Sequence, residues 1–415
     1  MRLSLPKTLW LAGLLLLAGC ASRPPAASLP SAHVPLLLVS VDGLRPTDVT
    51  EAQMPALARL ARQGVVADQG MVPSYPSLTF PNHYTLVTGL RPDHHGIIQN
   101  TMRDDTLGPF ALSDRNAVGD GRWWNDGLPI WVSAEQAGLR TATMFWPGSE
   151  AEIHGHRPSY WLPFDKTMSP QARVERLLTW LDLPADLRPT LLTLYFDQVD
   201  HESHDFGPDS ERALEARQQI DRALGSLLDG LQQRGLAGHL NLIVVSDHGM
   251  TRVAPGHVVA IEDMAPAEDV EPINGGQVVG FVAKPGRETA AAQHLLGRHD
   301  HYQCWRKQDL PARWHYGTHP RVPSFVCQMD EGWDALPRKY AQQRPNRDRG
   351  SHGFDPELPS MRATFIASGP AFRDGVHLPP FDNVDVYPLL AHLLGIAPAA
   401  NDGDLTPLLP ALKAP

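Results

Sequence analysis

The chain has 415 residues, of which 42% are hydrophobic and 20% are charged, and its formal net charge is −10 at pH 7. This is the composition of a globular protein long enough for one large domain or two modest ones. The acidic balance excludes a broad nucleic-acid-binding surface, because such surfaces are basic. An anionic substrate would need local positive charge, which bound metal ions can supply.

The first residues have the pattern of a secretion signal. Arg2 and Lys7 precede an apolar run, residues 9–17, that is too short to span a bilayer. The run ends in Leu-Ala-Gly before Cys20, which resembles the bacterial lipobox. We expect a signal peptide over residues 1–19 and a lipid anchor on Cys20, which would hold the protein on the outer membrane facing the periplasm. The alternative is a plain signal peptide in which this cysteine is incidental.

The residues after the cysteine separate the signal from the folded part. Residues 20–34 are rich in Pro, Ala and Ser, a composition typical of a flexible spacer. The folded domain is therefore expected over residues 35–415. Its oligomeric state cannot be predicted from the chain.

Within this domain, apolar runs of strand length alternate with helical patterns. The runs that predict buried strands are residues 36–41, 191–196, 242–246 and 362–367. Helices are expected to begin near residue 54 and to include residues 174–181, 220–231 and 386–394. This alternation predicts an α/β fold with a mostly parallel central sheet and helices on both faces.

The pattern loosens between residues 255 and 350, where we expect loops rich in aromatic residues and proline that form an inserted cap subdomain. Cys304 and Cys327 lie in this stretch, and outside the cytoplasm two such cysteines can pair. They fit two buried thiols equally well. No cysteine spacing typical of a metal site is present.

Acids and histidines follow several of the predicted strands. Asp42 and the pair Asp247-His248 end two of the apolar runs, and Asp200 follows a third. In open α/β sheets, ligands bind beyond the carboxyl ends of the strands, so these residues predict one shared site. A helix after the third strand would place His204 on the same face as Asp200.

His352 lies in a glycine-containing loop and completes a set of three Asp and three His. Such a mixed oxygen and nitrogen set suits two zinc ions, which stabilise the attacking and leaving oxygens of a displacement at phosphorus. Thr79 is the candidate nucleophile, because a hydroxyl needs a base or a metal for activation. The sequence His201 to His204 is one residue short of the H-E-x-x-H zinc motif, and we exclude that interpretation.

The residues around these positions carry a family resemblance. The motifs are VSVDGLR at 39–45, TFPNHY at 79–84, HGIIQNTM at 95–102, WPGS at 146–149, SDHGM at 246–250, HGFD at 352–355 and NVDVYP at 383–388. Together they resemble the nucleotide pyrophosphatase/phosphodiesterase family of the alkaline phosphatase superfamily, over residues 36 to about 405.

The resemblance implies a site with two zinc ions. Asp200, His204 and His352 would hold one ion, and the other would be held beside Thr79 by the remaining three ligands, Asp42, Asp247 and His248. Thr79 would itself bind this second zinc as an alkoxide, attack the phosphorus and form a covalent intermediate, which water activated on the other zinc would then hydrolyse. The products would include a nucleoside 5′-monophosphate.

The same resemblance suggests the substrate contacts. Asn100 would stabilise a non-bridging oxygen together with the backbone N–H of Thr79. Phe80, Phe164 and Tyr195 are candidate contacts for the rest of the substrate, and Phe164 stands where many members of the family have a tyrosine that stacks on a nucleobase. The missing hydroxyl leaves choline-type and other non-nucleotide diesters open as substrates.

The sequence fits other functions on the same fold less well than it fits a phosphodiesterase. Residues 74–78 (SYPSL) are faintly similar to a sulfatase motif, but Leu78 stands where that motif has arginine. A phosphomonoesterase would keep a guanidinium for the extra phosphate charge, whereas the match of Asn100 favours a diester. A catalytically silent binding protein would be expected to have lost a ligand or the nucleophile, and this chain has lost neither.

Overall fold

The computed structural model describes residues 33–414. The signal peptide, Cys20 and all but the end of the spacer predicted for residues 20–34 lie outside these residues, so those assignments stay predictions. Residues 34–415 form one compact unit. Within the described part of the chain, no helix is both long and apolar enough to cross a membrane.

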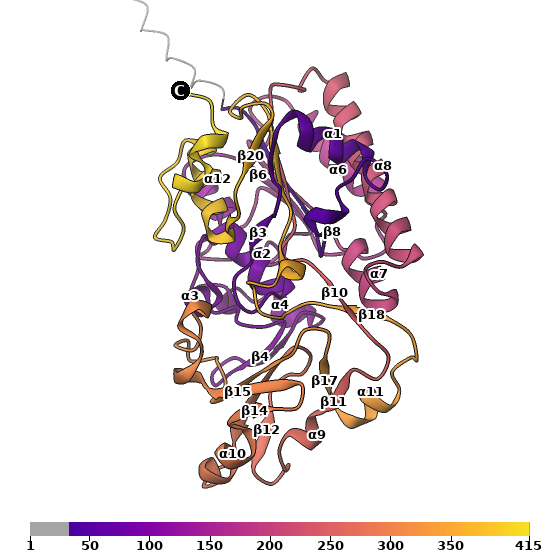
Figure 1. Ribbon diagram of the computed structural model, residues 1–415. Helices are drawn as coiled ribbons and strands as arrows, with labels where there is room; N and C mark the ends of the chain where they lie inside the picture. Colours follow the sequence, from indigo (N-terminus) through magenta and orange to yellow (C-terminus); the bar gives the residue numbers. More distant parts are fainter. Residues whose placement is uncertain (1–32, 415) are drawn as a thin grey trace, which may run out of the picture. The chain divides into compact units, whose positions relative to one another are not determined.

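The centre of this unit is an eight-stranded sheet (Figure 1). Its order is β20-β2-β19-β9-β1-β8-β6-β7, and every pairing is parallel except the two made by β19. The strands are β1 (Leu36–Val41), β2 (Val65–Ala67), β6 (Thr141–Met144), β7 (Tyr160–Leu162), β8 (Leu191–Phe196), β9 (Asn241–Val245), β19 (Phe365–Ser368) and β20 (Val376–Leu378).

The adjacent inner strands β1 and β8 are buried along their whole length, as expected of strands covered on both faces. β1 pairs with β8 from Leu36 opposite Leu191 to Val41 opposite Phe196. Both strands therefore end at the same edge of the sheet. The predicted mostly parallel α/β sheet is confirmed, although β19 begins three residues later than the expected strand and runs antiparallel.

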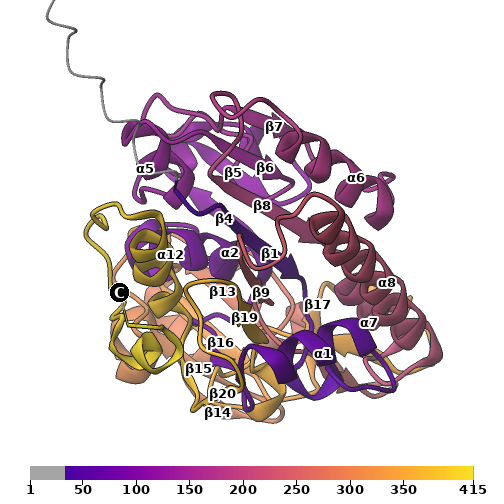
Figure 2. The same cartoon turned by 90° about the horizontal axis from the view of Figure 1, so that it is seen from above.

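Helices cover both faces of the sheet, as Figure 2 shows. One face packs against α1 (Pro55–Gln63), α6 (Pro170–Leu181), α7 (Gln198–Phe206) and α8 (Glu211–Gln233). The other face packs against α2 (Thr79–Thr88), α5 (Ile130–Gln136) and α12 (Val386–Leu394). Serine hydroxyls cap two of these helices: Ser169 accepts from the N–H of Ala172 in α6, and Ser210 from that of Ala213 in α8.

A second sheet occupies residues that we expected to form loops. This five-stranded antiparallel sheet has the order β12-β13-β16-β15-β14. Its strands are β12 (Val270–Pro272), β13 (Val278–Ala283), β14 (Gly297–His299), β15 (Tyr302–Arg306) and β16 (Phe325–Met329). The loop prediction was wrong here because these strands are short and separated by turns, which weakens the period-2 signal.

The second sheet has its own apolar core. Phe281 and Phe325 are buried in it together with Leu295 of α10 (Glu288–Leu295). Cys304 on β15 lies opposite Cys327 on β16, and the two form a disulfide. Of the two alternatives, a disulfide and two buried thiols, the structure therefore shows the disulfide.

Shorter elements connect the two sheets and border the site. They are β3 (Met71–Val72), α3 (Pro92–His95), β4 (Thr101–Asp104), β5 (Gly108–Ala111), α4 (Arg115–Val118), β10 (Thr251–Val253), β11 (Val258–Ala260), α9 (Ile261–Met264), β17 (Asp334–Leu336), α11 (Arg338–Gln342), β18 (Arg349–Ser351) and β21 (Phe381–Asp382). β10 pairs with β18, so the chain returns beside the place where it left the central sheet.

Candidate active site

The predicted metal ligands lie together at the carboxyl edge of the central sheet. Asp42 follows β1 directly, and Asp247 and His248 follow β9. Asp200 and His204 lie on α7, the helix after β8, and His352 follows β18. Gly43 has φ +69°, and a Cβ there would lie only 3.2 Å from Cβ of Asp200, so glycine permits this close approach.

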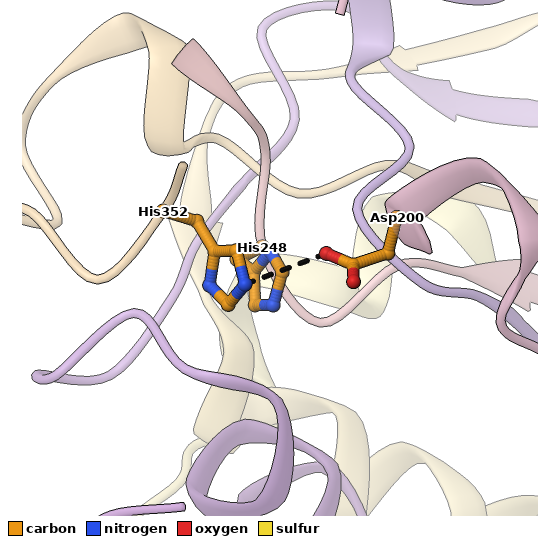
Figure 3. Close-up of side chains that lie close together, drawn as sticks. All are labelled: Asp200, His248 and His352. Atoms are coloured by element: carbon orange, nitrogen blue, oxygen red, sulfur yellow. Dashed lines mark ion pairs between the residues drawn. The ribbon is translucent and has the colours of Figure 1, made fainter. Parts of the chain in front are cut away.

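These side chains form two clusters with metal-ligand geometry. One cluster is Asp42, Asp247 and His248, and the other is Asp200, His248 and His352; in each, the candidate ligand atoms lie within 4.8 Å of one another. Figure 3 shows the second cluster, in which the Asp200 carboxylate faces two stacked imidazoles. His248 thus belongs to both clusters, which makes them contiguous.

His204 lies beside the second cluster without being one of its three members. Its Nε2 is 3.4 Å from Oδ1 of Asp200, and Nε2 of His352 lies at the same distance from that oxygen. The helix predicted after the third strand therefore exists and places both residues on one face. Asp200 is the carboxylate around which these imidazoles gather.

The donor set fits metal ions. Oδ1 of Asp42, Oδ1 of Asp200 and Oδ2 of Asp247 are buried and accept no hydrogen bond from any residue that the structure describes. A buried carboxylate oxygen without a partner is costly, and a cation removes that cost. These three oxygens are therefore the ones that metals would contact.

The histidines are oriented in the same sense. Nδ1 lies 2.9 Å from a backbone carbonyl oxygen in each of them: that of Gly350 for His204, Gly249 for His248 and Ser77 for His352. An Nδ1–H bonded to a carbonyl leaves the lone pair of Nε2 free for a metal. In all three residues this Nε2 is the atom that faces a carboxylate.

The ionisable side chains of this site shift one another's pKa values. Burial, with the neighbouring Asp247 and Asp200, raises the pKa of Asp42 well above its usual range. Burial also lowers the pKa of His352 to about 3, and the stacked His248 adds to this effect. Burial disfavours the charged imidazole at His204 and His248 as well, but Asp200 and Asp247 outweigh it and raise the pKa values of these two histidines. Metal ions bind the neutral imidazole, so metal binding at this site would be coupled to the loss of protons.

Thr79 is the first residue of α2 and lies beside the first cluster. Its Oγ1 is 3.3 Å from Nε2 of His248. The helix N-terminus presents the backbone N–H of Thr79 and a positive partial charge to anything bound there. Asn100 accepts a hydrogen bond from the N–H of Phe80 at 2.9 Å, which leaves its amide N–H groups free to donate.

A cavity of about 350 Å³ opens beside Thr79. It is lined by Thr79, Asn100 and members of both metal clusters, and by the predicted aromatic contacts Phe80, Phe164 and Tyr195. The hydroxyl of Tyr195 donates to Oδ2 of Asp42 at 2.6 Å. This tyrosine therefore fixes the orientation of a metal ligand as well as lining the cavity.

The sequence analysis assigned no role to several residues of the site. His83 lies under the first cluster, with its Nδ1 3.3 Å from Oδ2 of Asp247 and its Nε2 2.8 Å from Oγ of Ser40. Its position four residues after Thr79 on one helix is the signal that could have found it. Arg115 pairs with Glu150 in the wall of the cavity, and Glu150 accepts from the N–H of Phe164 at 2.9 Å.

Comparison with known proteins assigns this arrangement to a family. The family model described as type I phosphodiesterase / nucleotide pyrophosphatase matches residues 36–355. The chain belongs to this family. Its relatives are named as hydrolases of phosphodiester and diphosphate bonds, and the same reaction class applies to this chain.

Among these type I phosphodiesterase relatives is a fission yeast pyrophosphatase/phosphodiesterase (Schizosaccharomyces pombe). It is 35% identical over 90% of this chain and 80% of its own length. A venom phosphodiesterase of the cobra Naja atra is 36% identical over 92% of this chain. The chain spans less than half of that venom enzyme, so further activities of the longer protein are not transferred.

Solved structures of the family have the same fold. Murine ectonucleotide pyrophosphatase/phosphodiesterase 5 aligns with a TM-score of 0.86 and 32% identity, over 91% of this chain and all of that chain. Its human counterpart aligns with the same TM-score at 31% identity. The predicted alkaline-phosphatase-like fold is thereby confirmed.

Proposed function

We propose that this protein is a zinc-dependent hydrolase that cleaves phosphodiester and diphosphate bonds of nucleotides. It would release a nucleoside 5′-monophosphate through a covalent intermediate on Thr79. One observation carries this proposal: three buried carboxylate oxygens, without hydrogen-bond partners among residues 33–414, belong to two clusters that share His248, and Nε2 of His248 is 3.3 Å from the hydroxyl of Thr79 at a helix N-terminus. That combination offers a place for cations directly beside a nucleophile.

The first cluster, Asp42, Asp247 and His248, would hold one zinc ion next to Thr79. Asp200 and His352, with His204 at the same carboxylate, would hold the other. Two bound ions would supply positive charge to the attacking and leaving oxygens of a displacement at phosphorus. Mixed carboxylate and imidazole ligands suit zinc.

Thr79 and Asn100 would contact the reacting phosphorus group directly. Oγ1 of Thr79 bonds to phosphorus as the leaving group departs, and water then releases the nucleoside monophosphate from the threonine. The amide of Asn100, held by its bond to the N–H of Phe80, donates to a non-bridging oxygen. Because this donor is neutral, it suits the single negative charge of a diester better than the double charge of a monoester.

The cavity supports a nucleotide as the substrate. Phe80 and Phe164 line a space of about 350 Å³, the size of a small-molecule pocket. The murine relative was solved in complex with AMP as an inactive threonine-to-alanine form, which fits both the product and the nucleophile. A choline-type diester would use the same reacting groups without the stacked base.

Kinetics on purified, zinc-loaded protein test the reaction. The nitrophenyl ester of thymidine 5′-monophosphate should be turned over in preference to nitrophenyl phosphate, nitrophenyl sulfate and nitrophenyl phosphocholine. Thr79→Ala should lower diester turnover roughly 10³-fold or more, because the covalent route is lost. Dominant turnover of the monoester, the sulfate or the choline ester would replace the proposed substrate class.

Two variants control this experiment. Thr79→Ser restores a hydroxyl and should recover part of the activity. Thr88→Ala removes a threonine from the last turn of the same helix, where its hydroxyl donates to the carbonyl of Tyr84, and should leave turnover near that of the unmodified protein. Zinc content should be unchanged in all three, and retained turnover in Thr79→Ala would refute the nucleophile.

A further inference from the structure

A second cavity of about 220 Å³ lies behind the loop that leads into α2. Its lining residues include Arg91, Arg313, Arg362 and His315. None of its lining residues also lines the catalytic cavity. Glu357 and Asp382 are its two carboxylates, so the formal charge of the lining is positive with histidine neutral.

One arginine of this cavity lacks a counter-charge. Nη2 of Arg91 pairs with Asp382 at 2.7 Å, and Nη1 of Arg313 donates to Asp355 at 2.6 Å. For the guanidinium of Arg362 there is no ion pair or hydrogen bond to any residue between 33 and 414, and its Nη1 is buried without a partner. A guanidinium in this state offers several donors to a ligand.

A neutral donor at the same cavity is also unsatisfied. The Tyr75 side chain is 1% exposed, with its ring stacked on Trp314 at 4.1 Å between centroids. Its hydroxyl has no hydrogen-bond partner among the described residues. Burial raises the pKa of this hydroxyl well above its usual range, so it keeps its proton and remains a donor. Leaving such buried donors unpaired costs free energy that an acceptor ligand would recover.

We propose that this cavity binds a small phosphate-type oxyanion, with Arg362 as the unpaired cation and Tyr75 as a neutral donor. A tetrahedral oxyanion presents several acceptor oxygens and matches the donor fork of a guanidinium. The volume holds roughly seven waters at about 30 Å³ each, which is enough for such an anion with part of its hydration.

Ligand contact requires a side-chain movement, because Nη1 of Arg362 and the hydroxyl of Tyr75 are both sealed from water. Arg362 is only partly buried, so a change of its rotamer can bring the guanidinium to the ligand. Inorganic phosphate and the phosphate group of a nucleoside monophosphate present the same chemistry to this site.

The two cavities must be separated experimentally, because the loops around them are connected. Ser77, two residues after Tyr75, accepts a hydrogen bond from His352, and Met361, next to Arg362, accepts one from the N–H of Gly249. Equilibrium dialysis of the zinc-loaded protein with labelled inorganic phosphate, in the presence of saturating unlabelled AMP, fills the catalytic cavity first. A parallel arm uses labelled AMP alone.

The expected result is one anion beyond the occupant of the catalytic cavity. Extra phosphate in the first arm identifies inorganic phosphate as the ligand, whereas two AMP molecules per chain in the second arm identify a phosphate monoester. Arg362→Gln should weaken this extra binding roughly tenfold or more, as expected for the loss of a charged hydrogen bond. Arg176→Gln, on the exposed face of α6, should leave it unchanged.

Tyr75→Phe keeps the ring stack and removes only the hydroxyl, so it tests the site even if Arg362→Gln fails to fold. It should weaken the extra binding several-fold without lowering the melting temperature. The proposal is overturned if neither anion shows a second site. It is equally overturned if the second site binds as tightly in folded Arg362→Gln, or in Tyr75→Phe, as in the unmodified protein.

Discussion

The eight-stranded sheet and the five-stranded sheet differ in how each uses the ends of its strands. In the eight-stranded sheet, Asp42 directly follows β1, Asp247 lies two residues after the end of β9, and β8 leads into the helix that carries Asp200. In the five-stranded sheet, β15 and β16 are joined by a disulfide, and its described strands contribute no member of either metal cluster. The candidate metal ligands thus lie where parallel strands end, whereas the disulfide joins two paired antiparallel strands.

The sharpest test of this contrast is the removal of one ligand at a strand end. Asp247→Asn should lose bound metal and leave diester turnover undetectable, because Asp247 contributes an unpartnered oxygen and lies 2.9 Å from His248. Elemental analysis and kinetics measure the two effects, and chelation of the unmodified protein should reproduce them. Asp221→Asn, a buried carboxylate that caps α1, is the matched control and should retain metal.

A smaller effect is expected at Asn100, which is proposed to contact the substrate and no metal. Asn100→Ala should lower kcat by roughly 10²- to 10³-fold, as for the loss of one oxyanion donor. Asn100→Asp preserves the acceptor for the N–H of Phe80 but loses the donor, so it should be at least as slow. If the aspartate variant were near normal, the residue would serve only to hold the loop.

The smallest effect on catalysis should come from the five-stranded sheet. Replacing Cys304 and Cys327 together by serine should cost about 3 kcal/mol of unfolding free energy, as expected for a loop of this length. Because both cysteines belong to a separate core, kcat/KM should change less than about twofold. Denaturant unfolding and kinetics on the same preparation measure both quantities, and a large drop in kcat/KM would show that the two sheets are coupled.

The central sheet could be predicted because its signals are local. Buried parallel strands are continuous apolar runs, so residues 36–41 and 191–196 were placed to the residue. The carboxyl ends of parallel strands lie at one edge of the sheet. The acids that end such runs, Asp42 and Asp247, are therefore predicted from the sequence to lie in one site.

The rest depends on contacts between distant residues. Arg115 and Glu150 meet in the wall of the cavity without any spacing that links them, and strands such as β14, with three residues, are too short for a reliable period. The family resemblance divided the six ligands between two ions. The structure adds that His248 borders both clusters and that Tyr195 holds Asp42.

The pairing of β10 with β18 has a consequence for the order of assembly. The chain leaves the central sheet near His248, and all strands of the five-stranded sheet come before His352 in chain order. His352 follows β18, which pairs with β10. During synthesis from the N-terminus, every other ligand of the two clusters emerges before this histidine. The second metal site can therefore be completed only once the intervening segment has folded well enough to bring residue 351 beside residue 251. Metal binding at this second site would then be a late step that requires the whole domain to have folded.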